Sequence, residues 1–394
     1  MAGEPSFNLL ILGYSKISES ELMTNQIGIG IIGTGFGQKV HIPGLQNYCD
    51  TNIVAVYNRD IEKATAIASS HNIPYAFDSV DEIVADPDIV GLTVSTPPFL
   101  HFEMAKKVLH AGKHLFLEKP TTLNIDEACQ LYYLSQSKGC VVGMDFEFRF
   151  VPAWQRLAEL LAEGYVGQKR LIKIDWLVSS RADPSRSWNW YAQKQKGGGA
   201  LGAIGSHSFD YVHWLFGPVR RMSGLLSTAI LERPDPTESN QLKPVTADDT
   251  CLLTLELTDG TPCQISLSSV SAQGRGHWVE VYGSDGTLVL GSDNQKDYVH
   301  GFKLWGSQGG EALAEIPIPQ RLAFPKTFPD GRIAPFIRVV DRWVEGIRQG
   351  TALVPSLKEG VYSQLLMDLT HESNETGTWV DVPNLDKFLA ARSW

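Results

Sequence analysis

The stretch QIGIGIIGTGFG, from Gln26 to Gly37, decides the fold prediction for this chain. Its first half is an apolar, β-branched run typical of a buried strand, and its second half is a glycine-rich turn that opens a helix. Such a strand, turn and helix begin a doubly wound sheet, in which backbone N–H groups at the turn can bind a pyrophosphate. The candidate phosphate-binding residues are Gly33, Gly35, Phe36 and Gly37.

The glycine pattern departs from the strict G-x-G-x-x-G form, because Gln38 stands where the third glycine belongs. The segment from Gly28 to Gly33 satisfies the pattern, but it has bulky apolar residues where the loop should be. We therefore interpret that segment as part of the strand and place the phosphate loop after it.

Four further apolar runs follow, NIVAVY, IVGLTVS, HLFLE and CVVGM, and helical patterns separate them. Helices are predicted over residues 61–70, 99–111 and 125–138, with Gly112 and Gly139 as C-terminal caps. Continuous apolar strands separated by helices indicate a parallel sheet covered on both faces. The sequence thus predicts a Rossmann domain over residues 26–146.

Beyond this domain, strand-like segments follow one another with few helices between them, from RLIKIDWLVS to GTLVLG. Residues 147–394 are therefore predicted to form an α/β domain with an open, mostly antiparallel sheet. Its helices are expected over residues 152–163, 335–349 and 357–376. The segment 231–244 is rich in proline and polar residues and is predicted to be an exposed loop.

The composition narrows the class of protein. A chain of 394 residues with 43% hydrophobic residues is long enough for two domains. The net charge of -10 argues against nucleic-acid and membrane partners, which favour clustered Lys and Arg. Five scattered cysteines without a CxxC pair indicate a reducing, cytoplasmic setting and no metal site, and we interpret them as small buried hydrophobes. Residues 1–25 lack the features of an export signal and are predicted to be a flexible extension.

The end of the second strand bears on cofactor choice. NAD-dependent Rossmann domains normally place an acidic residue there, to bind the adenosine ribose. Here the strand ends at Asn58-Arg59, and Asp60 lies just past the tip. The missing carboxylate and the available guanidinium favour NADP, with NAD as the alternative. A solvated Arg59 paired with a neighbouring acid is the competing interpretation.

Three later motifs, together with GTGFG, point to a family. They are STPP at residues 95–98 with His101 after it, EKP at 118–120, and GGGALGAIGSHSFD at 197–210. In this order and spacing they resemble the Gfo/Idh/MocA oxidoreductases over nearly the whole chain. The resemblance implies a secondary alcohol or carbonyl of a sugar, cyclitol or similar polyol as substrate. It also implies a homodimer or homotetramer built on the open sheet.

The resemblance assigns Thr96, Pro97 and His101 to the cofactor cleft, and places Glu118 and Lys119 beside the nicotinamide ribose. It also makes Lys119 a candidate catalytic residue. An ammonium beside the reacting oxygen stabilises alkoxide character as hydride leaves carbon.

His207 matches the family histidine that exchanges a proton with the substrate hydroxyl, a task that suits a neutral imidazole. The family commonly has an acid four residues earlier, but this chain has Ala203. Asp210 lies on the same predicted helix face and is expected to orient His207. Arg149, Trp188 and Trp190, with His207 and Asp210, are the predicted substrate-binding residues.

Two other functions remain open at this point. A cofactor-sensing regulatory or binding protein of the same fold is compatible with Ala203. An NAD-dependent glycosidase, as found among relatives, would also use the same cofactor cleft. Retention of both Lys119 and His207 favours a catalytic role over a sensing role.

Overall fold

The computed structural model describes residues 26–294, 297 and 299–392. The predicted flexible extension, residues 1–25, lies outside the described residues. None of the helices in the described part combines the length and apolar character needed to cross a membrane.

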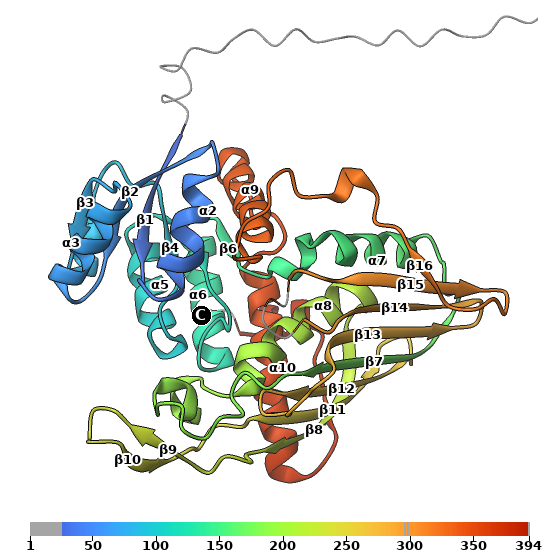
Figure 1. The fold of residues 1–394 in the computed structure, drawn as a ribbon. Coiled ribbons are helices and arrows are strands. Elements are labelled where there is room, and N and C mark those ends of the chain that lie inside the picture. Colours follow the sequence, from blue (N-terminus) through green and yellow to red (C-terminus); the bar gives the residue numbers. More distant parts are fainter. Residues whose placement is uncertain (1–25, 295–296, 298, 393–394) are drawn as a thin grey trace, which may run out of the picture.

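The first domain is built on a six-stranded parallel sheet in the order β3-β2-β1-β4-β5-β6 (Figure 1). The order reverses between β1 and β4, which is the switch point where such sheets bind ligands. The strands are β1 (Ile27–Ile32), β2 (Thr51–Tyr57), β3 (Tyr75–Phe77), β4 (Gly91–Val94), β5 (His114–Leu117) and β6 (Val142–Met144). The helices between them are α2 (Ile42–Gln46), α3 (Ile61–Ser70), α4 (Val80–Ala85), α5 (His101–His110) and α6 (Ile125–Lys138).

Side chains that alternate along β1 enter two different cores. Ile29 and Ile31 pack with residues of α2 and α3, whereas Ile32 packs with residues of α4 and α5. Burial on both faces explains the continuous apolar runs, so the predicted Rossmann sheet is confirmed. The predicted bounds of α3 and α6 also agree with the structure, and Gly139 ends α6 at a φ of +63°.

The second domain contains a nine-stranded sheet in the order β16-β15-β14-β13-β7-β12-β11-β8-β17. Only β7 and β12 pair in parallel, so the predicted mostly antiparallel sheet is confirmed. Its strands are β7 (Lys169–Leu177), β8 (Val219–Ser227), β11 (Thr250–Leu257), β12 (Pro262–Ser268), β13 (Gly276–Gly283), β14 (Gly286–Ser292), β15 (Lys303–Gln308), β16 (Ala314–Ile316) and β17 (Val380–Asp381).

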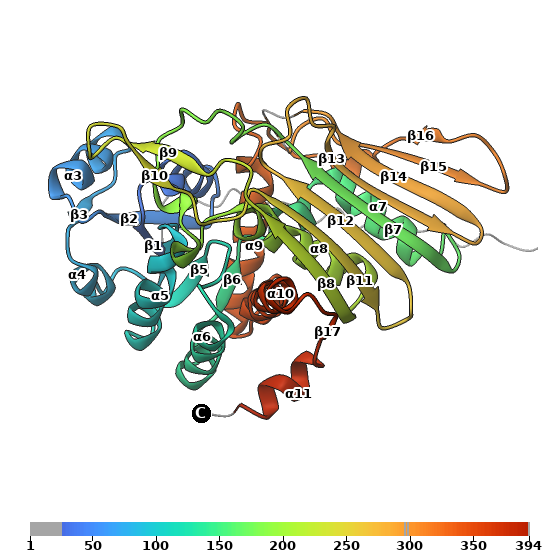
Figure 2. The same ribbon diagram turned by 90° about the horizontal axis from the view of Figure 1, so that it is seen from below.

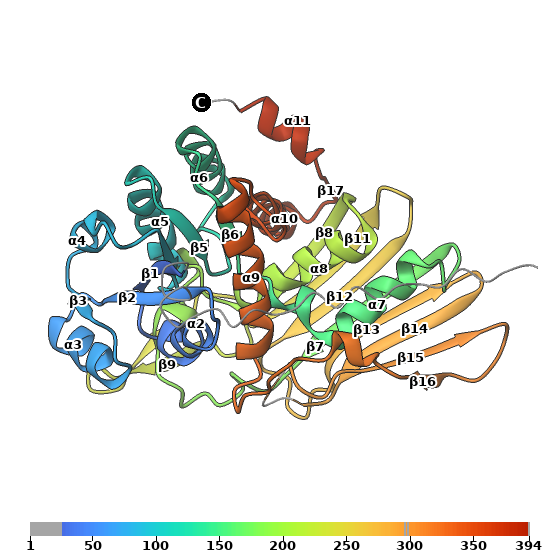
Figure 3. The ribbon, with the colours of Figure 1, turned by 90° about the horizontal axis from the view of Figure 1, so that it is seen from above.

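One face of this sheet packs against three helices (Figures 1 and 3). These are α7 (Pro152–Ala162), α8 (Ser206–Phe216) and α10 (Leu357–Thr376), and a short helix, α11 (Leu385–Ala390), ends the described chain. The opposite face is uncovered in the described residues, as Figure 2 shows. It leaves Leu225 58% and Leu252 46% exposed, and the indole of Trp278 stacks on that of Trp305 at 5.7 Å.

Helix α9 (Ile333–Gln349) returns from the second domain to the first sheet. Its Phe336 and Trp343 pack into the same core as Ile29 and Phe116. The two domains are therefore joined by a shared core as well as by the chain.

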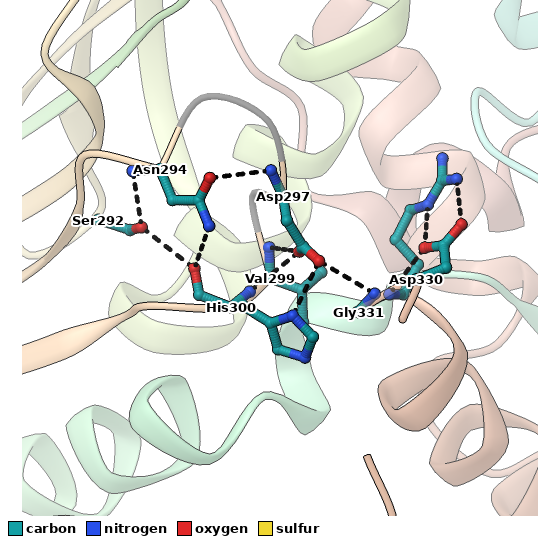
Figure 4. A network of polar contacts seen from close by, with 8 residues as sticks. Ser292, Asn294, Asp297, Val299, His300, Asp330 and Gly331 are labelled. Carbon is teal, nitrogen blue, oxygen red and sulfur yellow. Dashed lines mark hydrogen bonds and ion pairs between the residues drawn. The ribbon is translucent and has the colours of Figure 1, made fainter. Parts of the chain in front are cut away.

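The loop after β14 is fastened to the beginning of α9 (Figure 4). The Asp297 carboxylate accepts hydrogen bonds from the backbone N–H groups of His300 and Gly331, each at 3.1 Å. The carboxylate of Asp330, the residue before Gly331, accepts two hydrogen bonds from the Arg332 guanidinium. These contacts hold Arg332 beside the phosphate loop, where its guanidinium lies 4.9 Å from the centre of the Phe36 ring.

The predicted exposed loop over residues 231–244 is wrong in part, because it contains a hairpin of β9 (Glu232–Asp235) and β10 (Gln241–Pro244). The Asp235 carboxylate accepts hydrogen bonds from the backbone N–H and hydroxyl of Thr237, and this local turn brings the two strands together. The ladder is short and its turn residues dominate the composition, so sequence pattern alone indicated a loop. All five cysteines are free, but Cys49 is exposed rather than buried.

Candidate active site

The phosphate loop follows β1, and its three glycines serve two different purposes. Gly33 has a φ of +108°, and a Cβ there would lie 2.7 Å from the carbonyl carbon of Ser95. A Cβ on Gly37 would lie 2.6 Å from the Ser95 hydroxyl. Gly35 is different, since no described atom lies within 4 Å of its Cβ position. The first and third glycines thus allow close packing, whereas Gly35 leaves open space that suits a pyrophosphate.

A cleft of about 500 Å³ extends from this loop along the carboxyl ends of the parallel strands. Every predicted cofactor residue lines it except Gly37 and His101. Trp190 and Ala203 reach the same cleft from the second domain. The lining residues are Gly33, Thr34, Gly35, Phe36, Tyr57, Asn58, Arg59, Ser95, Thr96, Pro97, Pro98, Phe99, Leu100, Met104, Glu118, Lys119, Pro120, Trp190, Gly197 and Ala203.

The end of β2 presents an amide and a cation to the cleft. The Asn58 amide donates a hydrogen bond to the Thr34 hydroxyl at 2.5 Å, which ties the strand end to the phosphate loop. Arg59 is exposed and makes no ion pair with any residue in the described ranges. Asp60 instead caps α3 by accepting a hydrogen bond from the backbone N–H of Lys63. No carboxylate of this strand end therefore lines the cleft.

His101 lies behind the cleft wall, which corrects its predicted place in the cleft lining. Its Nδ1 is 2.8 Å from the Pro120 carbonyl oxygen and its Nε2 is 2.8 Å from the Thr96 carbonyl oxygen. The ring is 1% exposed and joins the end of β4 to the EKP segment. Its position in the first turn of α5 explains why it packs beneath the loop rather than facing the cleft.

A buried cluster that sequence reasoning missed lies beneath Lys119. His41 Nε2 contacts Glu118 Oε1 at 2.9 Å, and Glu118 shares a hydrogen bond with Asp145. Burial raises the pKa of Glu118 to about 7, and burial together with Glu118 raises the pKa of Asp145 well above its ordinary range. Burial lowers the pKa of His41 to about 4, so its ring is neutral.

These three side chains offer atoms within 4.8 Å of one another, which is the spacing of metal ligands. The contact between His41 and Glu118 and the hydrogen bond between Glu118 and Asp145 explain why the three side chains lie so close together. The two acids share a proton. His41, Glu118 and Asp145 lie far apart in the sequence, and no local spacing pattern identifies such a cluster. Only Glu118 was found, through the EKP motif.

Lys119 extends into the cleft and is held by a backbone group. Its Nζ donates a hydrogen bond to the carbonyl oxygen of Ala203 at 3.1 Å. Ala203 lies in a short π-helical segment, Leu201–Gly205, immediately before α8. Such segments loosen the regular hydrogen-bond ladder and are frequent at functional sites. At position 203, where the family commonly has an acid, Lys119 therefore contacts a backbone carbonyl group rather than a carboxylate.

His207 is 2% exposed and lies among the rings of Phe146, Phe148 and Trp176. Its Nε2 is 3.8 Å from Glu147 Oε2, a residue that sequence reasoning did not select. Burial, assisted by the Lys119 ammonium, lowers the pKa of His207 well below its ordinary value. The ring is thus neutral and able to accept a proton.

The predicted roles of Asp210 and Arg149 need correction. The Arg149 guanidinium binds the Asp210 carboxylate through Nε at 2.9 Å and Nη2 at 2.6 Å, and both side chains are nearly fully buried. Asp210 therefore pairs with Arg149 rather than orienting His207. Neither residue lines the cleft. Helical spacing predicts that Asp210 lies near His207. It does not reveal that Arg149, from the segment after β6, pairs with Asp210.

The two predicted substrate-site tryptophans have different surroundings. Trp190 lines the cleft, as expected. Trp188 instead donates its indole N–H to the Pro244 carbonyl oxygen at 3.0 Å, and its ring lies beside the Lys243 ammonium. It anchors the β9–β10 hairpin and is not a lining residue of the cleft.

Comparison with known proteins supports the same architecture. Residues 27–146 match the sequence model of the oxidoreductase family's NAD-binding Rossmann fold, and residues 158–382 match that of its C-terminal α/β domain. An uncharacterized oxidoreductase of Synechocystis sp. is 55% identical over 92% of this chain and 98% of its own length. Levoglucosan dehydrogenase of Pseudarthrobacter phenanthrenivorans is 26% identical over 91% of this chain and 99% of its own length.

Solved structures agree with the fold. Levoglucosan dehydrogenase in complex with NADH and levoglucosan superposes with a TM-score of 0.82, covering 91% of this chain and 100% of that one at 24% identity. Both family domains are matched in order and together cover most of the chain. The chain belongs to the Gfo/Idh/MocA family of oxidoreductases.

Proposed function

We propose that this protein transfers hydride between NADP(H) or NAD(H) and a secondary alcohol or carbonyl of a sugar, cyclitol or similar small polyol. The observation that supports this most directly is that Lys119 reaches the same cleft as the phosphate loop. The similarity to levoglucosan dehydrogenase supports a sugar-like substrate. In this proposal residues 26–146 bind the cofactor, and residues 147–394 contribute His207 and the substrate side.

The nicotinamide, when bound, supplies the carbon that accepts or donates hydride. The open space at Gly35 and the lining by Asn58 and Arg59 fit a dinucleotide that spans the cleft. During alcohol oxidation, Lys119 stabilises the negative charge that develops on the substrate oxygen. His207 accepts the hydroxyl proton, and its lowered pKa keeps it in the neutral form that this step requires.

For the choice of cofactor, we infer a preference for NADP(H). Arg59 is exposed at the end of β2 and lines the cleft, and Asp60 is engaged as a helix cap. A guanidinium without a carboxylate beside it favours a 2′-phosphate over a free ribose hydroxyl. NAD(H) remains the alternative, and competition between the two cofactors for binding measures the preference.

For assembly, we infer a homodimer or homotetramer that buries the uncovered face of the nine-stranded sheet. The exposed leucines and the stacked pair Trp278 and Trp305 make that face suited to association. The five free thiols support a reducing cytoplasmic setting. Light scattering coupled to gel filtration measures the assembly, and a monomer at micromolar concentration contradicts it.

The activity is tested by screening sugars, cyclitols and their oxidised forms with each cofactor and following the reduced-nicotinamide absorbance band. Reduction of NADP⁺ or NAD⁺ by at least one polyol supports the proposal. A protein that binds cofactor but turns over no polyol or oxidised sugar contradicts it.

A further inference from the structure

His207 lacks both the acid that the family commonly has at position 203 and the Asp210 carboxylate that the sequence predicted as its partner. Position 203 is alanine, and its backbone carbonyl accepts a hydrogen bond from Lys119. Asp210 is held by two charge-assisted hydrogen bonds from Arg149, both within the buried core. A histidine that exchanges protons depends on a partner for its orientation and tautomer, so another group must supply this function.

Glu147 has a carboxylate that lies close enough to His207 to serve as this partner. Its Oε2 is 3.8 Å from His207 Nε2, and the side chains are 4% and 2% exposed. No other acid in the described ranges comes within 4.0 Å of His207. Glu147 lies in a single 3-10 turn, Glu147–Phe150, that follows the carboxyl end of β6. It therefore comes from the segment that follows the Rossmann sheet, whereas Ala203 comes from the segment before α8.

The surroundings of His207 restrict how the ring can be used. Phe146, Phe148 and Trp176 surround it and leave few polar partners. Its Nδ1 is buried without a hydrogen-bond partner among the described residues. If Nε2 carries the hydrogen and faces Glu147, then Nδ1 has its lone pair free. This tautomer leaves one nitrogen as the base and gives the other to the acid.

We infer that Glu147 is the positioning acid of the proton-transfer site, accepting a hydrogen bond from His207 Nε2 and leaving Nδ1 as the base. This inference rests on the proposed hydride transfer. In alcohol oxidation, the substrate O–H bond breaks and its proton joins Nδ1, while the C–H bond breaks and its electron pair leaves as hydride to the nicotinamide. The imidazolium that results is stabilised by the Glu147 carboxylate until the proton is released to solvent.

The charge state of Glu147 gives the inference a pH signature. Asp145, Glu118, Lys119, Arg332 and His207 are the titratable and charged groups that face it. Burial and the neighbouring Asp145 raise the pKa of Glu147 to about 8, while Lys119 opposes this shift. Because the ionised form stabilises the imidazolium, kcat for oxidation should rise with pH as Glu147 ionises.

The test compares three proteins: the parent, Glu147→Gln and Glu147→Asp, which keeps the carboxyl group. Glu147→Gln should lower kcat by roughly 10²-fold, the lower end of what a positioned acid–base group contributes, and should remove the rise with pH. The cofactor dissociation constant should not change.

A second readout does not depend on a known substrate. Nitrogen NMR of labelled histidine should show the Nε2–H tautomer of His207 in the parent, and a change in that signal in Glu147→Gln. Glu147→Asp, which keeps the carboxyl group, should retain the parental tautomer and serves if the glutamine variant does not fold. If no polyol is turned over, the proposed function fails while this measurement still decides the role of Glu147. A parental tautomer and pH profile in Glu147→Gln overturns the inference.

Discussion

The two ends of the cleft are built on different physical principles. At the phosphate-loop end, backbone shape dominates: Gly33 packs tightly on Ser95, Gly35 faces open space, and Arg59 is exposed. At the proton-transfer end, buried titratable groups dominate, and Glu118, Glu147 and His207 all have shifted pKa values because of burial. The first end is suited to binding a ligand, whereas the second is suited to moving protons.

This contrast predicts that substitutions at the two ends have different consequences. A change at the phosphate loop acts on affinity and on local strain. A change at the proton-transfer end leaves buried charges or acids without partners, and acts on chemistry or on stability. The experiments below test this separation, beginning with the largest expected effect.

His207→Ala should lower kcat by about 10²–10⁴-fold, because a positioned acid–base group contributes on that scale. The dissociation constant for the cofactor should remain close to that of the parent, since the predicted cofactor-binding residues that line the cleft are unchanged. Steady-state kinetics on an identified polyol measure the first quantity, and fluorescence titration measures the second. His110→Ala is the matched control, because His110 is exposed on α5. Parental turnover in His207→Ala would remove His207 from the site.

Arg149→Leu should destabilise the fold by about 3–5 kcal/mol, because it leaves the Asp210 carboxylate buried without its partner. Urea unfolding of the two proteins measures the difference. The variant Arg149→Leu/Asp210→Leu should recover part of the loss, since no charge then remains buried. A small loss of stability together with an altered pH profile of activity would instead support the earlier prediction that Asp210 orients His207.

Gly33→Ala and Gly35→Ala form a matched pair at the other end. Gly33→Ala should cost about 1–3 kcal/mol of stability, because alanine is strained at a φ of +108° and its Cβ meets the Ser95 backbone. Gly35→Ala should keep parental stability and weaken dinucleotide binding, since its Cβ enters open space. Thermal unfolding and fluorescence titration separate the two effects. Equal losses of stability in both variants would contradict this description of the loop.

Glu118 should make binding of the oxidised cofactor depend on pH. Its pKa is raised to about 7, so its carboxylate forms as pH rises through neutrality and attracts a cationic nicotinamide more than a neutral one. The affinity for NADP⁺ relative to NADPH should rise by roughly tenfold, which corresponds to about 1.4 kcal/mol. Calorimetric titrations at acidic and alkaline pH measure this ratio. If the relative affinity rises by the same factor in Glu118→Gln, another group causes the pH dependence.

The smallest effect is expected for Arg59→Ala. An exposed charge contributes at most about 1 kcal/mol, so the preference for NADP(H) over NAD(H) should fall by roughly fivefold. Competition between the two cofactors in parent and variant measures it. Lys63→Ala, on the neighbouring helix α3, is the control. An unchanged ratio of the two affinities would show that Arg59 does not determine the cofactor preference.

The same contrast explains what the sequence predicted. The Rossmann sheet and the bounds of α3, α6 and α10 follow from local patterns of apolar residues and caps. The phosphate loop was found because strand, turn and helix are contiguous. The β9–β10 hairpin escaped because its ladder is short and its composition resembles a loop.

The proton-transfer end was predicted only where a motif marked it, at Glu118, Lys119 and His207. The contacts of His41 with Glu118, of Arg149 with Asp210 and of Glu147 with His207 span 77, 61 and 60 positions in the chain, respectively. No periodicity connects residues at such separations, because the tertiary fold alone brings them together. Buried polar pairs therefore require the structure, whereas backbone turns do not.

We propose that the cleft binds a nicotinamide cofactor at one end and that hydride transfer takes place at the other, where Lys119 lies. Binding and single-turnover reduction of NADP⁺ by an identified polyol, measured on the parent and on Lys119→Met, test it most directly. We expect nearly equal cofactor affinities and a rate of hydride transfer that is about 10²–10⁴-fold slower in the variant. Failure of the parent to bind either cofactor, or an unchanged rate in Lys119→Met, would contradict it.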